Sequence, residues 1–485
     1  MGCTVWGVWI ALNPAQRAHR AKRGRSRLFS SPFSESWSRE SLEAFVRCSR
    51  QRNRLREQVF REVFVDTSAL GLPDRFSPGA RGAVSPASHS ESYPMHQPLP
   101  LQGIRVVDLS RILSGPYCAM LLADMGAQVL KVESPQSPDQ ARTWGPPFHR
   151  EQVAPHFLAA NRGKRLLHLD LQDPTDLEHI RGLIAQADVV VENFKVGSLD
   201  KLGLSKTQLL QEHKRLIWCS ITGFGGSGPF AHRPGYDAIA QAASGWMSLT
   251  GNADCGPMKA APPILDQSTG LFAALGIVAK LHQRQSTGQG GLVEANLFSS
   301  GFALLGPFAQ STLLTGRSPK LVGNANPFIS PFGRFLCDQG SYLMLTIGSD
   351  QQFMTLCKLL GVEEGTAQEF AEHHVRLERA AELNQILQGA FSRLAAQEWE
   401  GILGARGIAC SSVNSVSEAL SHPQVEPLGL VQRYGFGQHQ IATPIFLDGA
   451  PLCSHCPAPL TEEALNPEGA FSWFGAKSTP SEVHS

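Results

Sequence analysis

Short apolar strands alternate with helices along this chain from residue 103 onward, and this alternation limits the folds that it can adopt. Residues 103–109 have the apolar character of a strand, and a turn at 110–115 leads to Pro116, whose fixed φ suits the first turn of a helix. Gly126 ends that helix, and residues 128–132 predict a second strand. This strand–helix–strand unit requires a parallel sheet with a right-handed crossover.

The same alternation repeats through residue 314. Residues 188–192 form an apolar run typical of a buried strand, and apolar positions at i, i+3, i+4 and i+7 within 268–283 predict a helix with one buried face. The remaining expected elements are strands at 165–169, 217–221 and 292–295, and helices at 174–187, 205–216 and 297–314. We therefore expect an α/β fold whose large domain contains a doubly wound, Rossmann-like parallel sheet.

Strands become fewer after Gly316, which indicates a second, smaller domain. Residues 351–360 and 376–394 predict helices, and 441–445 predicts a short extended segment. We expect four parts: a leader at 1–94, the large domain at 95–312, a small domain at 313–420, and a C-terminal segment at 421–485 that completes the large domain.

The leader has the composition of a mitochondrial presequence. Residues 1–34 contain no acidic residue, while six Arg and Lys lie between Arg17 and Arg27 beside many serines. Residues 35–94 show no sustained period, as in a processed or disordered leader. A mitochondrial matrix location follows. The alternative is that translation starts at Met95, which would leave the protein in the cytoplasm.

Composition excludes several broad classes of protein. The formal net charge is +1, so no overall positive field favours nucleic acid as a partner. No run approaches the roughly 18 apolar residues that a membrane-spanning helix needs, so we expect no membrane partner. Ten scattered cysteines favour a reducing compartment. Cys453 and Cys456 form one CxxC pair without a second pair of ligands, so we expect no metal site.

One glycine motif, at residues 223–228, matches the GxGxxG pattern of dinucleotide-binding loops. Pro229 and Pro234 follow it and prevent the helix whose N-terminus would hold a pyrophosphate, so we interpret the motif as a turn. The sequence contains no GxxxxGK[ST], GxSxG or HExxH motif. It therefore gives no sign of ATP-dependent, serine-hydrolase or zinc-protease chemistry.

Asp266 is a carboxylate between an apolar stretch and the helix expected from Ser268. Local pattern alone favours a turn or cap residue. Positive partial charge at a helix N-terminus would keep such a carboxylate ionised, and an ionised, positioned Asp can attack an acyl group. Composition does not choose between these two roles.

A resemblance to a known family bears on that choice. From about residue 101 to residue 460 the chain resembles the class III CoA-transferases (CaiB/BaiF type), with matching segments in the family's order. These segments are 107–116, 122–133, 142–147, 161–164, 187–194, 220–224, 235–237 and 323–331.

The resemblance implies that Asp266 is the catalytic nucleophile, which would form an aspartyl anhydride and then an aspartyl-CoA thioester. It implies CoA as a substrate, with no permanently bound cofactor, and backbone N–H groups near Gly323 as oxyanion donors. Ser134 and Asn326 depart from the family pattern, which usually has a basic residue and a histidine at these places. The implied CoA-binding residues are Arg111, Ile112, Leu113, Ser114, Asn193, Phe194 and Lys201.

Within the family, the leader and residues 142–147 most resemble the succinate–hydroxymethylglutarate (glutarate) members. This implies succinyl-CoA as donor and a short dicarboxylic acid as acceptor, with Arg142 or Arg334 as a possible partner of the distal carboxylate or as an ordinary structural arginine. It also implies an interlocked homodimer. Two alternatives remain: an acyl-CoA racemase, whose acid/base histidine is replaced here by Tyr236, and a non-catalytic acyl-CoA-binding homologue.

Overall fold

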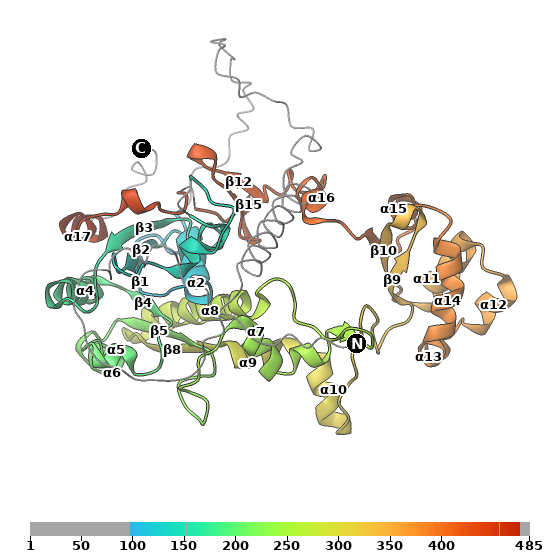
Figure 1. The fold of residues 1–485 in the computed structure, drawn as a ribbon, viewed down its shortest axis with the longest axis horizontal. Coiled ribbons are helices and arrows are strands. Elements are labelled where there is room, and N and C mark those ends of the chain that lie inside the picture. The colour runs from blue at the N-terminus through green and yellow to red at the C-terminus, as the bar shows by residue number, and fades with distance from the viewer. Residues whose placement is uncertain (1–97, 151–152, 455, 476–485) are drawn as a thin grey trace, which may run out of the picture. The chain divides into compact units, whose positions relative to one another are not determined.

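The computed structural model describes residues 98–150, 153–454 and 456–475, so the expected leader lies outside the described residues. Its centre is a six-stranded parallel sheet with the strand order β3-β2-β1-β4-β5-β8 (Figure 1). This confirms the predicted doubly wound sheet. The six strands, each at its expected place, are β1 (Arg105–Asp108), β2 (Gln128–Glu133), β3 (Lys164–His168), β4 (Val189–Glu192), β5 (Ile217–Thr222) and β8 (Gly291–Asn296).

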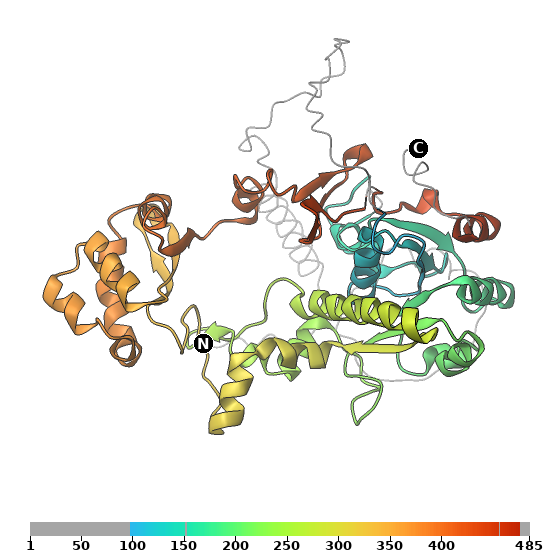
Figure 2. The ribbon, with the colours of Figure 1, turned by 180° about the vertical axis from the view of Figure 1, so that it is seen from behind.

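Helices cover both faces of this sheet. On one face α2 (Ser114–Asp124) and α8 (Ile264–Thr287) pack against Val106, Val129 and Val189 (Figure 2). On the other face α4 (Pro174–Gln186), α6 (Lys206–Glu212) and α17 (Pro467–Gly475) pack against the alternate residues Val107, Leu130 and Val190. Strands that are buried on both sides need continuous apolar runs, which explains the sequence pattern.

Several helix ends differ from the predictions. α8 begins at Ile264, four residues before the predicted Ser268, so Asp266 lies inside its first turn. α2 begins at Ser114 and not at Pro116.

Two stretches predicted as single helices are each divided. α9 (Leu297–Leu305) and α10 (Pro307–Thr315) meet at an angle of 75° because Gly306 adopts φ +50° and Pro307 cannot continue the preceding helix. Residues 376–394 likewise form parts of α13 (His373–Glu378) and α14 (Ala380–Phe391), separated at Arg379.

α8 extends beyond the predicted helix at 268–283, and by length and composition it could cross a membrane, although no membrane-spanning run was expected. The bent pair α9–α10 passes the same test. α8 packs against α2 and β8, however, and it buries Ala273 and Ile277 in the core of the sheet face. A core helix of a globular domain has these features.

A second hydrophobic core forms after α10. The antiparallel strands β9 (Phe332–Leu336), β10 (Tyr342–Thr346) and β11 (Ala409–Ser412) pack with α11 (Asp350–Leu360), α12 (Glu364–Glu369), α13, α14 and α15 (Ala396–Gly404). After α16 (Val416–Leu420) come the paired strands β12 (Val431–Arg433) and β13 (His439–Ile441). Leu465 then pairs with Leu167 in β3, and α17 packs on α4. These contacts return the C-terminal segment to the large sheet, while the domain limits remain predictions.

Candidate active site

A cavity of about 370 Å³ opens at the carboxyl ends of β1, β4 and β5. The strand order reverses between β1 and β4, and open α/β sheets bind ligands at such a point. The lining comes from the turn after β1, the segment after β4, the loop at 231–236 and the first turn of α8. Asp266 is the only acidic side chain among the described residues that line this cavity.

A second carboxylate, Asp237, anchors the first turn of α8 behind Asp266. Oδ1 of Asp237 accepts the backbone N–H of Leu265 at 2.8 Å and that of Asp266 at 3.2 Å. Oδ2 of Asp237 accepts the side-chain amide of Gln241 at 2.5 Å. Asp237 itself is buried as the first residue of α7 (Asp237–Ala243). Its side chain therefore fixes the backbone of the turn that carries the candidate nucleophile.

The electrostatic state of Asp266 differs from the prediction. Burial, and then the negative charge of Asp237, raise the pKa of Asp266 to about 7, although a hydrogen bond with the Ser114 side chain acts in the opposite direction. The predicted effect of the helix N-terminus is weak because Asp237 already occupies the N–H groups of this turn. At neutral pH, Asp266 is therefore only partly ionised in the unliganded protein.

Three glycines allow the backbone segments around Asp266 to approach one another. Gly270, one turn after Asp266, packs on the start of α2, where an added Cβ would lie 2.6 Å from the Ser114 carbonyl oxygen. Gly223 and Gly235 cross so closely that a Cβ on Gly223 would lie 2.6 Å from the Cα of Gly235. The prediction that residues 223–228 form a turn rather than a dinucleotide loop is confirmed, because no helix follows before α7.

The structure brings most of the predicted CoA-binding residues to this cavity. Its lining includes Arg111, Ile112, Ser114, Asn193 and Phe194.

Two of the predicted residues do not line it. Leu113 is buried immediately before α2. Lys201 is an exposed residue at the end of α5 (Ser198–Lys201), outside the lining, whereas Lys195 lies within it.

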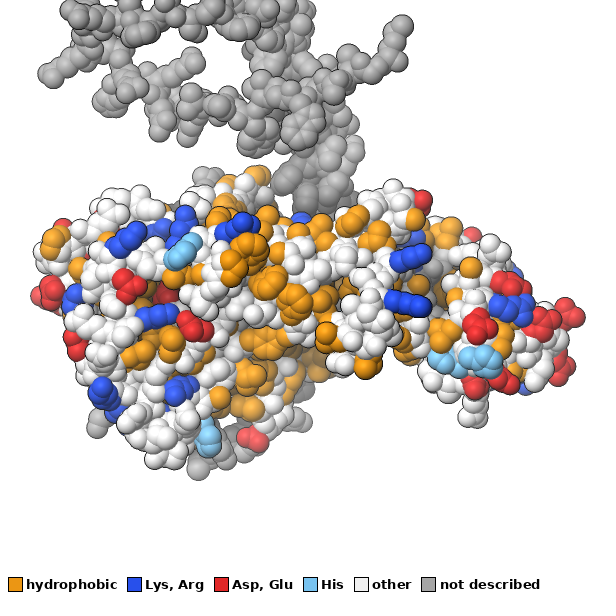
Figure 3. Space-filling view, turned by 90° about the horizontal axis from the view of Figure 1, so that it is seen from below, with side chains coloured by type: hydrophobic (Ala, Val, Ile, Leu, Met, Phe, Trp, Pro, Cys, Tyr) orange, Lys and Arg blue, Asp and Glu red, His pale blue; other side chains and the backbone are white. Residues whose placement is uncertain are grey.

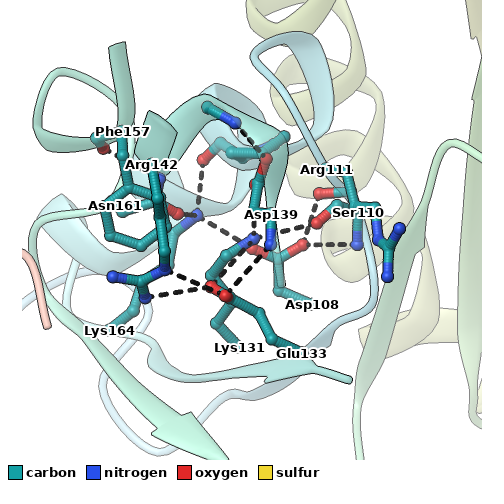
Figure 4. A network of polar contacts seen from close by, with 12 residues as sticks. Asp108, Ser110, Arg111, Lys131, Glu133, Asp139, Arg142, Phe157, Asn161 and Lys164 are labelled. Carbon is teal, nitrogen blue, oxygen red and sulfur yellow. Dashed lines mark hydrogen bonds and ion pairs between the residues drawn. The ribbon is translucent and has the colours of Figure 1, made fainter. Parts of the chain in front are cut away.

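The side-chain amide of Asn193 forms hydrogen bonds with the protein backbone at the turn after β1. The Oδ1 of Asn193 accepts the N–H of Arg111 at 2.8 Å, and its Nδ2 donates to the carbonyl of Arg111 at 2.7 Å. A network of buried charged groups lies next to this turn and includes Asp108, Lys131 and Asp139 (Figure 4). The turn after β1 is therefore held from two sides before any ligand arrives.

Other arginines and backbone groups proposed from the sequence lie elsewhere. Arg142 is buried, pairs with Glu133 at 2.9 Å and stacks 3.6 Å from the Phe157 ring centre, so its role is structural. The exposed Arg334 lines a separate surface cavity between β9 and α14. The N–H of Gly323 donates to the Gly251 carbonyl at 2.8 Å and is not free to stabilise an oxyanion in this chain.

Sequence reasoning missed His232 and Arg233, which line the cavity from the loop between β5 and α7. Their only sequence signal was the nearby matching segment at 235–237. Cys453 and Cys456 are free thiols. Within the described parts of the chain, no group of three or more His, Cys, Asp or Glu side chains is arranged to hold a metal ion.

Comparison with known proteins matches the chain to one family. The family model for CoA-transferase family III matches residues 101–464. The chain is 37% identical over 364 residues to succinyl-CoA:glutarate CoA-transferase from Mus musculus, covering 75% of this chain and 82% of the relative. It is also 37% identical over 370 residues to succinate–glutarate CoA-transferase from Agrobacterium fabrum, covering 74% and 92%.

Among solved structures, a CAIB/BAIF family protein from Brucella suis aligns with a TM-score of 0.69 at 38% identity, covering 76% of this chain and 97% of that one. Rv3272 from Mycobacterium tuberculosis aligns with a TM-score of 0.66 at 27% identity, covering 75% and 97%.

Proposed function

Since the chain belongs to CoA-transferase family III, we propose that it moves CoA from succinyl-CoA to a short dicarboxylic acid such as glutarate or hydroxymethylglutarate. The observation that carries this proposal is Asp266, the single acidic group among the described lining residues, at the switch point of a parallel sheet. The names of the relatives from mouse and Agrobacterium support the choice of substrates.

The proposed reaction begins at the carboxylate of Asp266. Its oxygen attacks the thioester carbonyl carbon of the donor, the C–S bond breaks, and CoA leaves as a thiolate beside a mixed anhydride. The thiolate then attacks the carbonyl carbon of Asp266, which forms an aspartyl-CoA thioester and releases succinate. No net energy input is needed, because one thioester is exchanged for another.

The second half reverses these steps with the new acid. The acceptor carboxylate attacks the aspartyl thioester and expels the thiolate, which then attacks the acceptor's acyl carbon and restores Asp266. Arg111, Lys195 and Arg233 would bind the anionic groups of the substrates, because cationic side chains form strong charge-assisted hydrogen bonds with phosphates and carboxylates. Holding the reacting groups together supplies much of the rate enhancement.

Isotope exchange tests the activity directly. Purified protein is incubated with succinyl-CoA and labelled glutarate, and glutaryl-CoA is measured over time. Hydroxylamine added during turnover should convert the aspartyl-CoA thioester to a hydroxamate on the peptide that contains Asp266. Asp266→Ala should abolish exchange while the far-ultraviolet spectrum stays unchanged; full exchange by this variant would refute the assignment.

A racemase is the second candidate because His232 lines the same cavity as Asp266 and could supply the second acid/base group. A racemase would incorporate deuterium from D₂O at the α-carbon of a branched acyl-CoA without any acceptor acid. We expect no such incorporation. A non-catalytic homologue would bind CoA but show neither activity.

The proposal extends to location and assembly: a mitochondrial matrix protein that functions as an interlocked homodimer. The composition of residues 1–34 supports the first part. A fluorescent protein fused behind residues 1–94 should enter mitochondria, whereas the chain that starts at Met95 should remain in the cytosol. Cytosolic fluorescence from the first fusion would contradict this location.

A further inference from the structure

The turn after β1 accepts hydrogen bonds from, and donates them to, buried charged side chains that lie outside the cavity lining. The ammonium of Lys131 donates to the carbonyl of Ser110 at 2.9 Å. The carboxylate of Asp139 accepts the N–H of Ile112, with distances of 3.1 and 3.2 Å to its two oxygens. Figure 4 shows Asp139 and Lys131 beside Ser110 and Arg111 of this turn. Two backbone groups of one ligand-facing turn therefore depend on the same buried pair.

Ile112 has a backbone conformation that needs such support. Its φ is +73°, in the left-handed region that β-branched residues rarely occupy. Ile112 nevertheless lines the cavity, next to Arg111 and two residues before Ser114, which also lines it. Strain of this kind persists only when the surroundings hold the backbone in place.

Fold stability alone does not account for the buried pair. The side chains of Lys131 and Asp139 are fully buried and lie 3.2 Å apart. Removing two charges from water is so costly that a buried ion pair adds little net stability compared with apolar side chains of similar size. The Asp139 carboxylate accepts hydrogen bonds from the Ile112 N–H, the Ala141 N–H and the Lys131 ammonium. Its partners point to control of backbone geometry.

We propose that Asp139, paired with Lys131, is a positioning residue that holds the turn at 110–112 in the conformation that receives CoA, without touching CoA itself. This inference rests on the proposed function, since it assigns a role to residues behind the same site. It also explains the strained backbone of Ile112, because the hydrogen bond from its N–H to Asp139 keeps this cavity-lining residue in the left-handed conformation.

The test is the affinity of the full chain for free CoA, measured by calorimetry, because binding needs no turnover. Asp139→Asn removes the charge that pairs with Lys131 and should raise the Kd for CoA about tenfold or more. Glycine adopts positive φ without strain, so Ile112→Gly added to Asp139→Asn should restore most of the affinity. A purely structural role of Asp139 would lower stability without this rescue.

The matched control is Asp124→Asn. Asp124 is also fully buried and pairs with an arginine, Arg162, at 2.6 Å, but its other hydrogen-bond partners are Thr443 and Ser454 and not the turn at 110–112. This variant should lose stability and keep the wild-type Kd for CoA. If Asp139→Asn does not fold, Asp139→Glu keeps the charge but misplaces the acceptor by one methylene, and it should weaken CoA binding in the same way.

Unchanged CoA affinity in the folded Asp139 variants overturns the inference, and so does a loss of affinity that Ile112→Gly fails to restore. If the wild-type protein binds CoA but shows no exchange, the proposed activity is wrong. The CoA affinities of the variants still test the present inference in that case. Equal losses in the Asp139 and Asp124 variants would also overturn it, because any buried carboxylate would then have the same effect.

Discussion

The ionisation of Asp266, the proposed nucleophile, depends first on its burial and then on the nearby carboxylate of Asp237. Asp237 accepts two backbone N–H groups of this turn, and its charge contributes to raising the pKa of Asp266. A carboxylate with a raised pKa is a better nucleophile once it is ionised, but a smaller fraction is ionised at neutral pH.

The pH profile of kcat/KM should report this ionisation. Since the pKa of Asp266 is raised to about 7, kcat/KM should rise with pH, reach half of its maximum near pH 7 and level off about one pH unit higher. Asp237→Asn keeps a hydrogen-bond acceptor but removes the charge, so the acid limb should move to lower pH. The control is Asp254→Asn, which removes an exposed carboxylate outside the cavity lining. An acid limb that stays in place in Asp237→Asn would contradict the coupling.

The same shift predicts a change in stability. A folded-state pKa of about 7 against an ordinary 3.8 means that ionising Asp266 destabilises the fold as pH rises from about 4 to about 7. Asp266→Asn should therefore be more stable than wild type above pH 7, by about 1–3 kcal/mol because the side chain is partly exposed to solvent. The difference should vanish below pH 4. Thermal unfolding of both proteins from pH 4 to pH 8 measures it, and equal stability at pH 8 would contradict it.

At the scale of elements, the contact between α2 and α8 brings the nucleophile to the turn after β1. Gly270 makes this contact possible, because any side chain there would collide with the backbone of Ser114 and Cys118. The two helices would then separate, and Asp266 would move away from Ser114.

Gly270→Ala should lower the free energy of unfolding by about 1–3 kcal/mol and reduce kcat/KM at least about tenfold. Denaturant unfolding and the exchange assay measure the two effects. The control is Gly389→Ala in α14, where an added Cβ meets nothing within 4 Å. That variant should gain up to about 1 kcal/mol, since alanine favours helix more than glycine does. Wild-type behaviour of Gly270→Ala would show that the contact can relax.

At the scale of the whole molecule, α8, α9 and α10 expose large apolar side chains in addition to those in the core. Figure 3 shows hydrophobic side chains gathered on the face seen from below. In the proposed homodimer, exposed apolar surface of this kind would form part of the interface. The large apolar side chains exposed on α8, α9 and α10 are Leu271, Phe272, Leu275, Phe302, Leu304, Leu313 and Leu314.

The purified protein should elute as a dimer in size-exclusion chromatography with light scattering. The double variant Leu275→Glu and Leu313→Glu should shift the population towards monomer, since each buried charge without a partner is costly at an interface. Val416→Glu changes an equally exposed apolar residue in α16 and serves as control. A monomeric wild-type protein would contradict the dimer.

The sequence alone determined the central sheet. Buried parallel strands need apolar runs, and the helices between them need one apolar face, so local windows were enough to place all six strands. The resemblance then supplied Asp266, together with Asn193 and the turn at 111–114, which follow strand ends in the matched segments.

Only the tertiary structure decided how these groups behave. Asp237 reaches Asp266 across 29 residues, Asp139 reaches Ile112 across 27, and Gly270 meets the start of α2 from another helix. The ionisation of a carboxylate and the shape of a strained turn depend on burial and on neighbours that are distant in the chain. A local sequence window contains neither of these, so an ionised cap at Asp266 was predicted where folding produces a buried carboxyl group beside a second charge.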